Sequence, residues 1–179
     1  MTLAEAIREA AYLEGDFVLR SGRRSSYYLD KYRFGTRPDL LRPLGEAIAA
    51  AVAEHEPSAQ RIAAPELGAV PLAAAASLAG GLPFVIVRKE PKEYGTANRV
   101  EGAFEPGECV CLVEDVVTSG GAAVAAVHAL RETGLRVSTA VCVVDREEGG
   151  VDELARHAVR LWPLLRASEL AAAPARPHG

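Results

Sequence analysis

Short apolar runs alternate with longer segments of helical apolar spacing over most of this chain. The apolar runs predict strands at 61–64, 83–87, 110–113, 137–144 and 159–162. Segments rich in alanine and leucine predict helices over 36–54, from the 65–71 turn to about 79, over 122–130 and over 151–157. A repeated strand–helix order favours a parallel sheet with right-handed crossovers, and strands that are apolar throughout favour burial on both faces. The expected fold is therefore α/β, with a parallel-sheet core flanked by helices.

The segments outside this core have patterns of their own. Thr2 and Glu5 have the spacing of a capping box and predict a helix that runs to about residue 13. Residues 17–30 predict a β-hairpin with a Ser-Gly turn. Near the other end, 164–170 predicts a helical turn or two, and 171–179 predicts a frayed tail. Because the chain of 179 residues contains no long linker, we expect a single domain.

The composition limits the possible partners and locations. The formal net charge of −4 gives no general attraction to nucleic acid or to an anionic membrane. No apolar stretch can span a bilayer and no apolar signal core is evident at the N-terminus, so we expect a cytoplasmic protein. The three cysteines, Cys109, Cys111 and Cys142, fall in expected core strands without a complete zinc-ligand set, which favours buried thiols.

The stretch 110–121, VCLVEDVVTSGG, carries the clearest candidate chemistry. A predicted strand ends in two acids, Glu114 and Asp115, and a polar turn leads into a helix. The turn consists of Thr118, Ser119, Gly120 and Gly121. Its hydroxyls, its glycine backbone and the positive end of the helix dipole suit a phosphate dianion, and the carboxylates could hold sugar hydroxyls or a metal-bound ligand. The alternative is an ordinary turn with a capping hydroxyl, which two adjacent acids disfavour.

No GxGxxG follows a strand and no GxxxxGK[ST] occurs, so dinucleotide-binding and P-loop sites lack their motifs. The 110–121 stretch instead resembles the phosphoribosyl diphosphate (PRPP) signature of the type I phosphoribosyltransferases. In the same family, the turn that holds pyrophosphate often carries Lys where this chain has Gly68. The resemblance therefore implies that this basic contact is missing or is supplied from elsewhere.

A second motif narrows the resemblance. Residues 17–30 have the pattern FxLxSGRxSxYYxD, which is similar to the N-terminal hood of the orotate phosphoribosyltransferases. The resemblance implies that Tyr27 and Tyr28 form the aromatic pair that covers orotate, and that Arg20 stands where Lys is common. It also implies that Thr118 and Arg146, the latter in a VDRxEG-like corner after the 137–144 strand, contact orotate. An arginine at this corner could otherwise be a surface residue that pairs with a neighbouring glutamate.

A third motif lies at 88–95. It resembles the family's catalytic loop, RKxxKxHG, with Arg88, Lys89 and Lys92 in matching positions. Tyr94 stands where His is usual, which removes a group that titrates near neutrality but keeps a hydrogen-bond donor for an anion. Without the resemblance, the stretch would be interpreted as a solvated surface loop.

The resemblance implies a type I phosphoribosyltransferase fold with residues 1–35 as the hood, about 36–165 as the core and 171–179 as the tail. It implies transfer of phosphoribose from PRPP to orotate, with Mg²⁺ held mainly through PRPP rather than by direct protein ligands. Arg88, Lys89, Lys92 and Asp115 are the expected catalytic residues. Arg88, Lys89, Lys92, Tyr94, the two acids and the 118–121 turn are the expected PRPP site. A homodimer that shares its catalytic loops is also implied.

Two other functions remain open at this point. One is a phosphoribosyltransferase for another nucleobase, which would not need the SGRxSxYY segment or Arg146. The other is a non-catalytic regulator on the same fold that binds PRPP or RNA. The net negative charge and the intact basic loop at 88–95 argue against the regulator.

Overall fold

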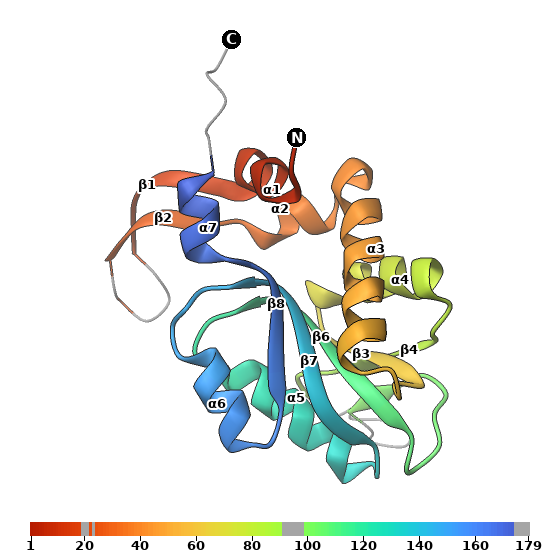
Figure 1. Ribbon diagram of the computed structural model, residues 1–179. Helices are drawn as coiled ribbons and strands as arrows, with labels where there is room; N and C mark the ends of the chain where they lie inside the picture. Colours follow the sequence, from red (N-terminus) through yellow and green to blue (C-terminus); the bar gives the residue numbers. More distant parts are fainter. Residues whose placement is uncertain (19–21, 23, 91–98, 174–179) are drawn as a thin grey trace.

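The computed structural model describes residues 1–18, 22, 24–90 and 99–173. A six-stranded sheet in the order β5-β4-β3-β6-β7-β8 forms its centre (Figure 1). The strands are β3 (Arg61–Pro65), β4 (Phe84–Val87), β5 (Val100–Glu101), β6 (Cys109–Val117), β7 (Arg136–Asp145) and β8 (Arg160–Arg166). Neighbouring strands are parallel, except that β5 pairs antiparallel with β4. The predicted α/β core is confirmed. The strand β5 was not predicted, because so short a strand shows no detectable period of apolar residues.

Helices cover both faces of this sheet: α3 (Pro38–His55) and α4 (Ala69–Gly80) on one, α5 (Gly121–Glu132) and α6 (Gly150–Arg156) on the other. Successive side chains of a strand point to opposite faces. In β6, Cys111 and Val113 pack with α3 and α4, whereas Val110 and Leu112 pack with α5 and α6. Burial on both faces favours apolar residues at successive positions, which explains the unbroken apolar run at 110–113.

The N-terminal segment packs on the face of the core that α3 and α4 cover, where Ile7, Leu29 and Phe34 join the same hydrophobic cluster. It consists of α1 (Leu3–Ala11), the antiparallel hairpin of β1 (Tyr12–Val18) and β2 (Arg24–Leu29), and α2 (Lys31–Gly35). The predicted capping box is present, since Thr2 and Glu5 each accept a hydrogen bond from the other's backbone N–H. α7 (Ala167–Ala172) lies beside α1, where Arg8 Nη1 donates to the carbonyls of Leu170 and Ala171 at 2.7 and 3.0 Å.

Several predicted boundaries were wrong. α1 ends at Ala11 rather than near residue 13, because Tyr12 already pairs with Leu29 in the hairpin. The 164–170 helix was misplaced, since β8 continues its ladder with β7 as far as Arg166 and α7 begins only afterwards. α2 was not predicted at all. The three cysteines are free and buried, as expected. Within the described residues, none of the helices combines the length and apolar character that crossing a membrane requires.

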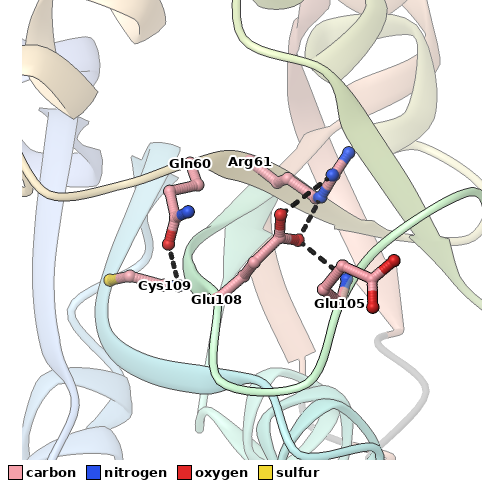
Figure 2. Close-up of polar contacts among 5 residues, drawn as sticks. All are labelled: Gln60, Arg61, Glu105, Glu108 and Cys109. Carbon is pink, nitrogen blue, oxygen red and sulfur yellow. Dashed lines mark hydrogen bonds and ion pairs between the residues drawn. The ribbon is translucent and has the colours of Figure 1, made fainter.

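Side-chain contacts fix the amino ends of two core strands (Figure 2). Arg61, the first residue of β3, donates from Nε and Nη2 to the Glu108 carboxylate at 2.5 and 3.0 Å. The same carboxylate accepts the backbone N–H of Glu105 at 3.1 Å, and Gln60 Oε1 accepts that of Cys109 at 3.1 Å. These contacts lie at the opposite end of the strands from the carboxyl ends of β3 and β6.

Candidate functional site

A cleft of about 500 Å³ opens at the carboxyl ends of β3, β4 and β6. Turns that follow parallel strands meet at this edge, where α/β sheets bind their ligands. The cleft is lined by these residues of the predicted PRPP site: Arg88, Lys89, Glu114, Asp115, Thr118, Ser119, Gly120 and Gly121. The structure therefore brings together two motifs that lie apart in the sequence. The predicted Arg20, Lys92 and Tyr94 lie outside the described residues.

The two acids are inside β6 rather than beyond its end, because β6 stays paired with β7 as far as Val117. Glu114 and Asp115 are only 7% and 2% exposed, although both line the cleft. Burial, reinforced by the charge of Asp115, raises the pKa of Glu114 to about 8, against the opposing effect of Lys31. A carboxyl group with this pKa is mostly protonated at neutral pH.

Asp115 has one charged partner on the cleft wall. Lys31 Nζ, from the first residue of α2, lies 2.8 Å from Asp115 Oδ2. The other oxygen, Oδ1, accepts the backbone N–H of Val116 at 2.6 Å. Apart from the Lys31 ammonium, the buried Oδ2 atom has no hydrogen-bond partner within the described residues. One carboxylate oxygen is thus satisfied by the backbone, and the other depends on a side chain from the N-terminal segment.

The 118–121 turn leads into α5 without a side-chain cap. Gly120 has φ of +87°, and a Cβ there would lie 3.2 Å from the backbone of Gly150. A residue with a side chain would therefore be strained as well as crowded at this position. The first backbone N–H groups of a helix have no partners within the helix, and they favour an anion. The turn lines the cleft and so presents these anion-favouring groups to it.

Basic side chains lie on the opposite wall, around the carboxyl end of β4. Arg88, Lys89 and Arg99 all line the cleft. The backbone N–H of Arg88 donates to the Arg99 carbonyl at 2.7 Å, so the two ends of the 88–99 segment are held together. Glu66 Oε1 accepts the backbone N–H of Lys89 at 2.6 Å, which ties this wall to the turn after β3. The cleft therefore combines a carboxylate, free amides and cations, which together suit a phosphorylated sugar.

The residues predicted for the base form a different arrangement. The Arg146 guanidinium lies 4.6 Å from the centre of the Tyr27 ring, and Tyr27 stacks on Tyr12 with ring centres 4.8 Å apart. Arg8 lies 4.6 Å from the Tyr12 ring on the far side. These four side chains, Arg8, Tyr12, Tyr27 and Arg146, form a continuous stack that joins α1, the hairpin and the end of β7. Because Arg146 Nε is buried without a hydrogen-bond partner among the described residues, a donor remains for a ligand.

Tyr28 does not join this stack. It faces Phe17 at 5.7 Å between ring centres and is 44% exposed. Neighbouring residues of a strand point to opposite faces, so Tyr27 and Tyr28 cannot both reach Arg146. Arg146 also pairs with Glu148 at 3.1 Å. The ion pair with a neighbouring glutamate, which was the alternative interpretation of this arginine, is therefore present. Neither Tyr27 nor Arg146 is among the residues that line the cleft, whereas Thr118 is.

Sequence reasoning missed Lys31, Glu66, Arg8 and Tyr12. The capping-box spacing of Thr2 and Glu5 predicted the helix that carries Arg8, but it did not predict a ligand contact. Asp30, which accepts the Tyr32 N–H at 3.2 Å as the N-cap of α2, was a possible signal for the helix that carries Lys31. That signal predicts a helix start but not the direction of a lysine side chain.

No protein-family model matches this chain. The orotate phosphoribosyltransferase of Methanocella arvoryzae is 47% identical over 169 residues, which cover 94% of this chain and 95% of that protein. The crystal structure of Mycobacterium tuberculosis orotate phosphoribosyltransferase with Fe(III) dicitrate has a TM-score of 0.83 and 31% identity, covering 94% and 96% of the two chains. The same M. tuberculosis protein in complex with PRPP has a TM-score of 0.80 and 29% identity over the same shares.

Proposed function

Because this chain belongs to the orotate phosphoribosyltransferase family, we infer that it transfers the phosphoribosyl group of PRPP to orotate. The products are orotidine 5′-monophosphate and pyrophosphate, in the biosynthesis of pyrimidines, and the enzyme is a pentosyltransferase. The observation that carries this conclusion is the near full-length identity of 47% to a named relative. The cleft supports it, since the acid pair, the uncapped turn and the basic wall all meet there.

We propose that the 118–121 turn and the first turn of α5 hold the 5′-phosphate of PRPP through their backbone amides. Glu114 and Asp115 then bind the ribose hydroxyls. Glu114, with its pKa near 8, can donate a hydrogen bond to a hydroxyl oxygen, while Asp115 accepts one. The negative charge of Asp115 also stabilises the positive charge that develops on the sugar as pyrophosphate leaves. Asp115 is therefore assigned both binding and catalytic roles.

Arg88, Lys89 and Lys92 offset the charge that accumulates on the leaving pyrophosphate, and Tyr94 donates a hydrogen bond to it. Arg88 and Lys89 line the cleft, which supports this assignment. Orotate is already an anion, so a strong general base is not required, and an enzyme with Tyr at position 94 can function without a histidine there. Lys92 and Tyr94 are assigned from the sequence resemblance alone.

Mg²⁺ fits this site as a partner of the substrate. Among the described residues, no cluster of three or more His, Cys, Asp or Glu side chains could hold a metal ion by itself. Magnesium usually keeps several waters and binds through one or two carboxylates together with phosphate oxygens, a pattern for which the Asp115 region suffices. When bound to PRPP, the ion supplies further neutralisation of the leaving group.

On the base side, Arg146 is assigned to the orotate carboxylate, because its buried Nε has no hydrogen-bond partner among the described residues and arginine binds carboxylates through paired hydrogen bonds. Tyr27 holds the Arg146 guanidinium in place through the stack. Arg20, Tyr28 and Thr118 remain proposed orotate contacts, with Thr118 between the phosphate turn and the base. We also propose a cytoplasmic homodimer in which the 88–95 loop serves the neighbouring subunit's site, with no nucleic-acid or membrane partner.

The test is the ultraviolet absorbance of orotate after the protein is mixed with PRPP and magnesium. Loss of orotate that requires both PRPP and the metal is expected. Consumption of PRPP with another nucleobase, and not with orotate, would keep the fold and change the substrate. Binding of PRPP without turnover of any base would instead support a non-catalytic regulator.

A further inference from the structure

The ion pair between Lys31 and Asp115 crosses the space directly above Gly68. A Cβ at position 68 would lie 1.8 Å from Asp115 Oδ2 and 3.5 Å from Lys31 Cε. Gly68 has an ordinary φ of −68°, so its backbone conformation does not explain the glycine. The space that a side chain at position 68 would need is already occupied by Asp115 and the Lys31 stem. Because glycine has no side chain, position 68 leaves the space that the ion pair occupies.

The partners differ in their exposure. The Asp115 side chain is 3% exposed and the Lys31 side chain 39%. Although partial burial opposes it, the Asp115 carboxylate raises the pKa of Lys31, so the lysine remains an ammonium ion at neutral pH. Lys31 therefore reaches from the cleft wall toward a buried carboxylate. Its helix, α2, begins immediately after the hairpin strand β2. Lys31 therefore comes from the N-terminal segment and not from a turn that follows a core strand.

We propose that Lys31 is a positioning residue for the PRPP site: it holds the Asp115 carboxylate, across the space left by Gly68, in the orientation that the ribose hydroxyls require. This inference rests on the proposed role of Asp115. A basic side chain from α2 thereby occupies the region that a side chain of the β3–α4 turn would otherwise fill. The backbone hydrogen bond from Val116 fixes only Oδ1, so within the described part of the chain Oδ2 depends on Lys31.

An ion pair that only stabilises the fold has no need to lie in the cleft, and its removal would change stability alone. Lys31 and Asp115 both line the ligand cleft, beside the turn of residues 65–68. The inference therefore predicts a defect in PRPP use that a loss of folding stability does not explain.

The first test compares Lys31→Met with Arg33→Met, which removes one positive charge from the same helix. Arg33 pairs with Asp30 at 3.3 Å and its side chain is 53% exposed. In Lys31→Met, kcat/KM for PRPP should fall by about 10- to 100-fold, the usual cost of removing a residue that orients a functional ligand. The KM for orotate and the activity of Arg33→Met should stay at wild-type values. Lys31→Arg should recover part of the loss, because it keeps the charge with a different shape.

The second test moves the same carboxylate without touching Lys31. Gly68→Ala places a methyl group against Asp115 Oδ2 and should produce the same PRPP defect. Since both changes act on one group, the double variant should be no slower than the slower single variant, rather than showing the product of both losses. Circular dichroism and thermal melting would confirm that each variant is folded at the assay temperature.

The inference is overturned if folded Lys31→Met uses PRPP as well as the wild type, or if the two defects multiply. It is also overturned if Arg33→Met loses as much activity as Lys31→Met. These outcomes are distinct from a failure of the proposed function, in which the wild-type protein itself would not consume orotate with PRPP and magnesium.

Discussion

The two halves of the proposed site, one for phosphate and one for the base, are built from different groups. The phosphate half, defined by Glu114, Asp115 and the 118–121 turn, belongs to β6 and the start of α5, in the middle of the sheet. The base half, defined by the stack of Arg8, Tyr12, Tyr27 and Arg146, depends on side chains from α1, the hairpin and the end of β7. The first uses backbone groups held by the core. The second uses ring faces and guanidinium groups held by one another.

This difference has a mechanical consequence. The strand that carries the two acids, β6, is paired on both sides, so its backbone can shift little. The hairpin of the base half forms a separate two-stranded sheet and meets the core largely through side chains. Substitutions in the phosphate half should therefore change turnover, whereas substitutions in the base half should change mainly the recognition of orotate.

The largest effect is expected from Asp115→Asn. The amide is close in size but cannot offset the positive charge that develops on the ribose, so kcat should fall by about 10²- to 10³-fold. The KM for orotate should remain close to that of the wild type, because the stack is unaffected. Steady-state kinetics with each substrate varied in turn would measure both. A large rise in the KM for orotate would break the division into two halves.

A smaller effect, confined to the base half, is expected from Arg146→Ala. Loss of a charge-assisted hydrogen bond to the orotate carboxylate should lower kcat/KM for orotate by about 10- to 100-fold. PRPP affinity, measured by calorimetry with magnesium and without orotate, should not change. Arg146→Lys should recover little, since an ammonium cannot reproduce the planar contact with Tyr27. Weaker PRPP binding in Arg146→Ala would show that the halves are coupled through β7.

The last effect concerns stability rather than activity, and it sharpens the contrast on the phosphate side. Glu114 has a pKa near 8 when folded and a lower, ordinary value when unfolded, so the folded state binds its proton more tightly. Its contribution to stability is present below the unfolded pKa and is lost as the pH rises toward 8. Without substrates, the free energy of unfolding should fall by about 1 kcal/mol per pH unit between pH 5 and 8.

Glu114→Gln should flatten this slope, which denaturant titrations at several pH values would reveal. Glu148→Gln, beside Arg146 in the base half, serves as the comparison and should leave the slope in place. If Glu114→Gln kept the full slope, the raised pKa of Glu114 would not be its source.

The phosphate half was predictable because its parts are consecutive. Twelve residues, 110–121, contain the apolar run, the acids and the turn. A strand followed directly by a turn and a helix places the acids and the turn beside the same cleft. The alternation of strand and helix likewise predicted the layers of the fold. The strand end was misjudged because Glu114 and Asp115 interrupt the apolar pattern while the ladder to β7 continues. Polar residues inside a buried strand are a sign of function rather than of a strand's end.

The base half and Lys31 were harder to predict, because they depend on contacts between segments far apart in the chain. No period in the sequence indicates that Tyr12 stacks on Tyr27, or that the Lys31 side chain reaches Asp115. Tyr28 is a different case. The predicted strand already implied that two adjacent tyrosines face opposite ways, so their treatment as a pair could have been questioned from the sequence.

The hydrogen bonds from Arg8 to the carbonyls of Leu170 and Ala171 join positions 162 and 163 residues apart. During synthesis on a ribosome, α1 emerges first and α7 is the last of the described elements to emerge. The strands and turn of the phosphate half are complete well before that. A nascent chain can therefore form the strands and turn of the proposed sugar-phosphate pocket while α1 still lacks its contact with α7, so the segment translated first is the one whose docking is completed last.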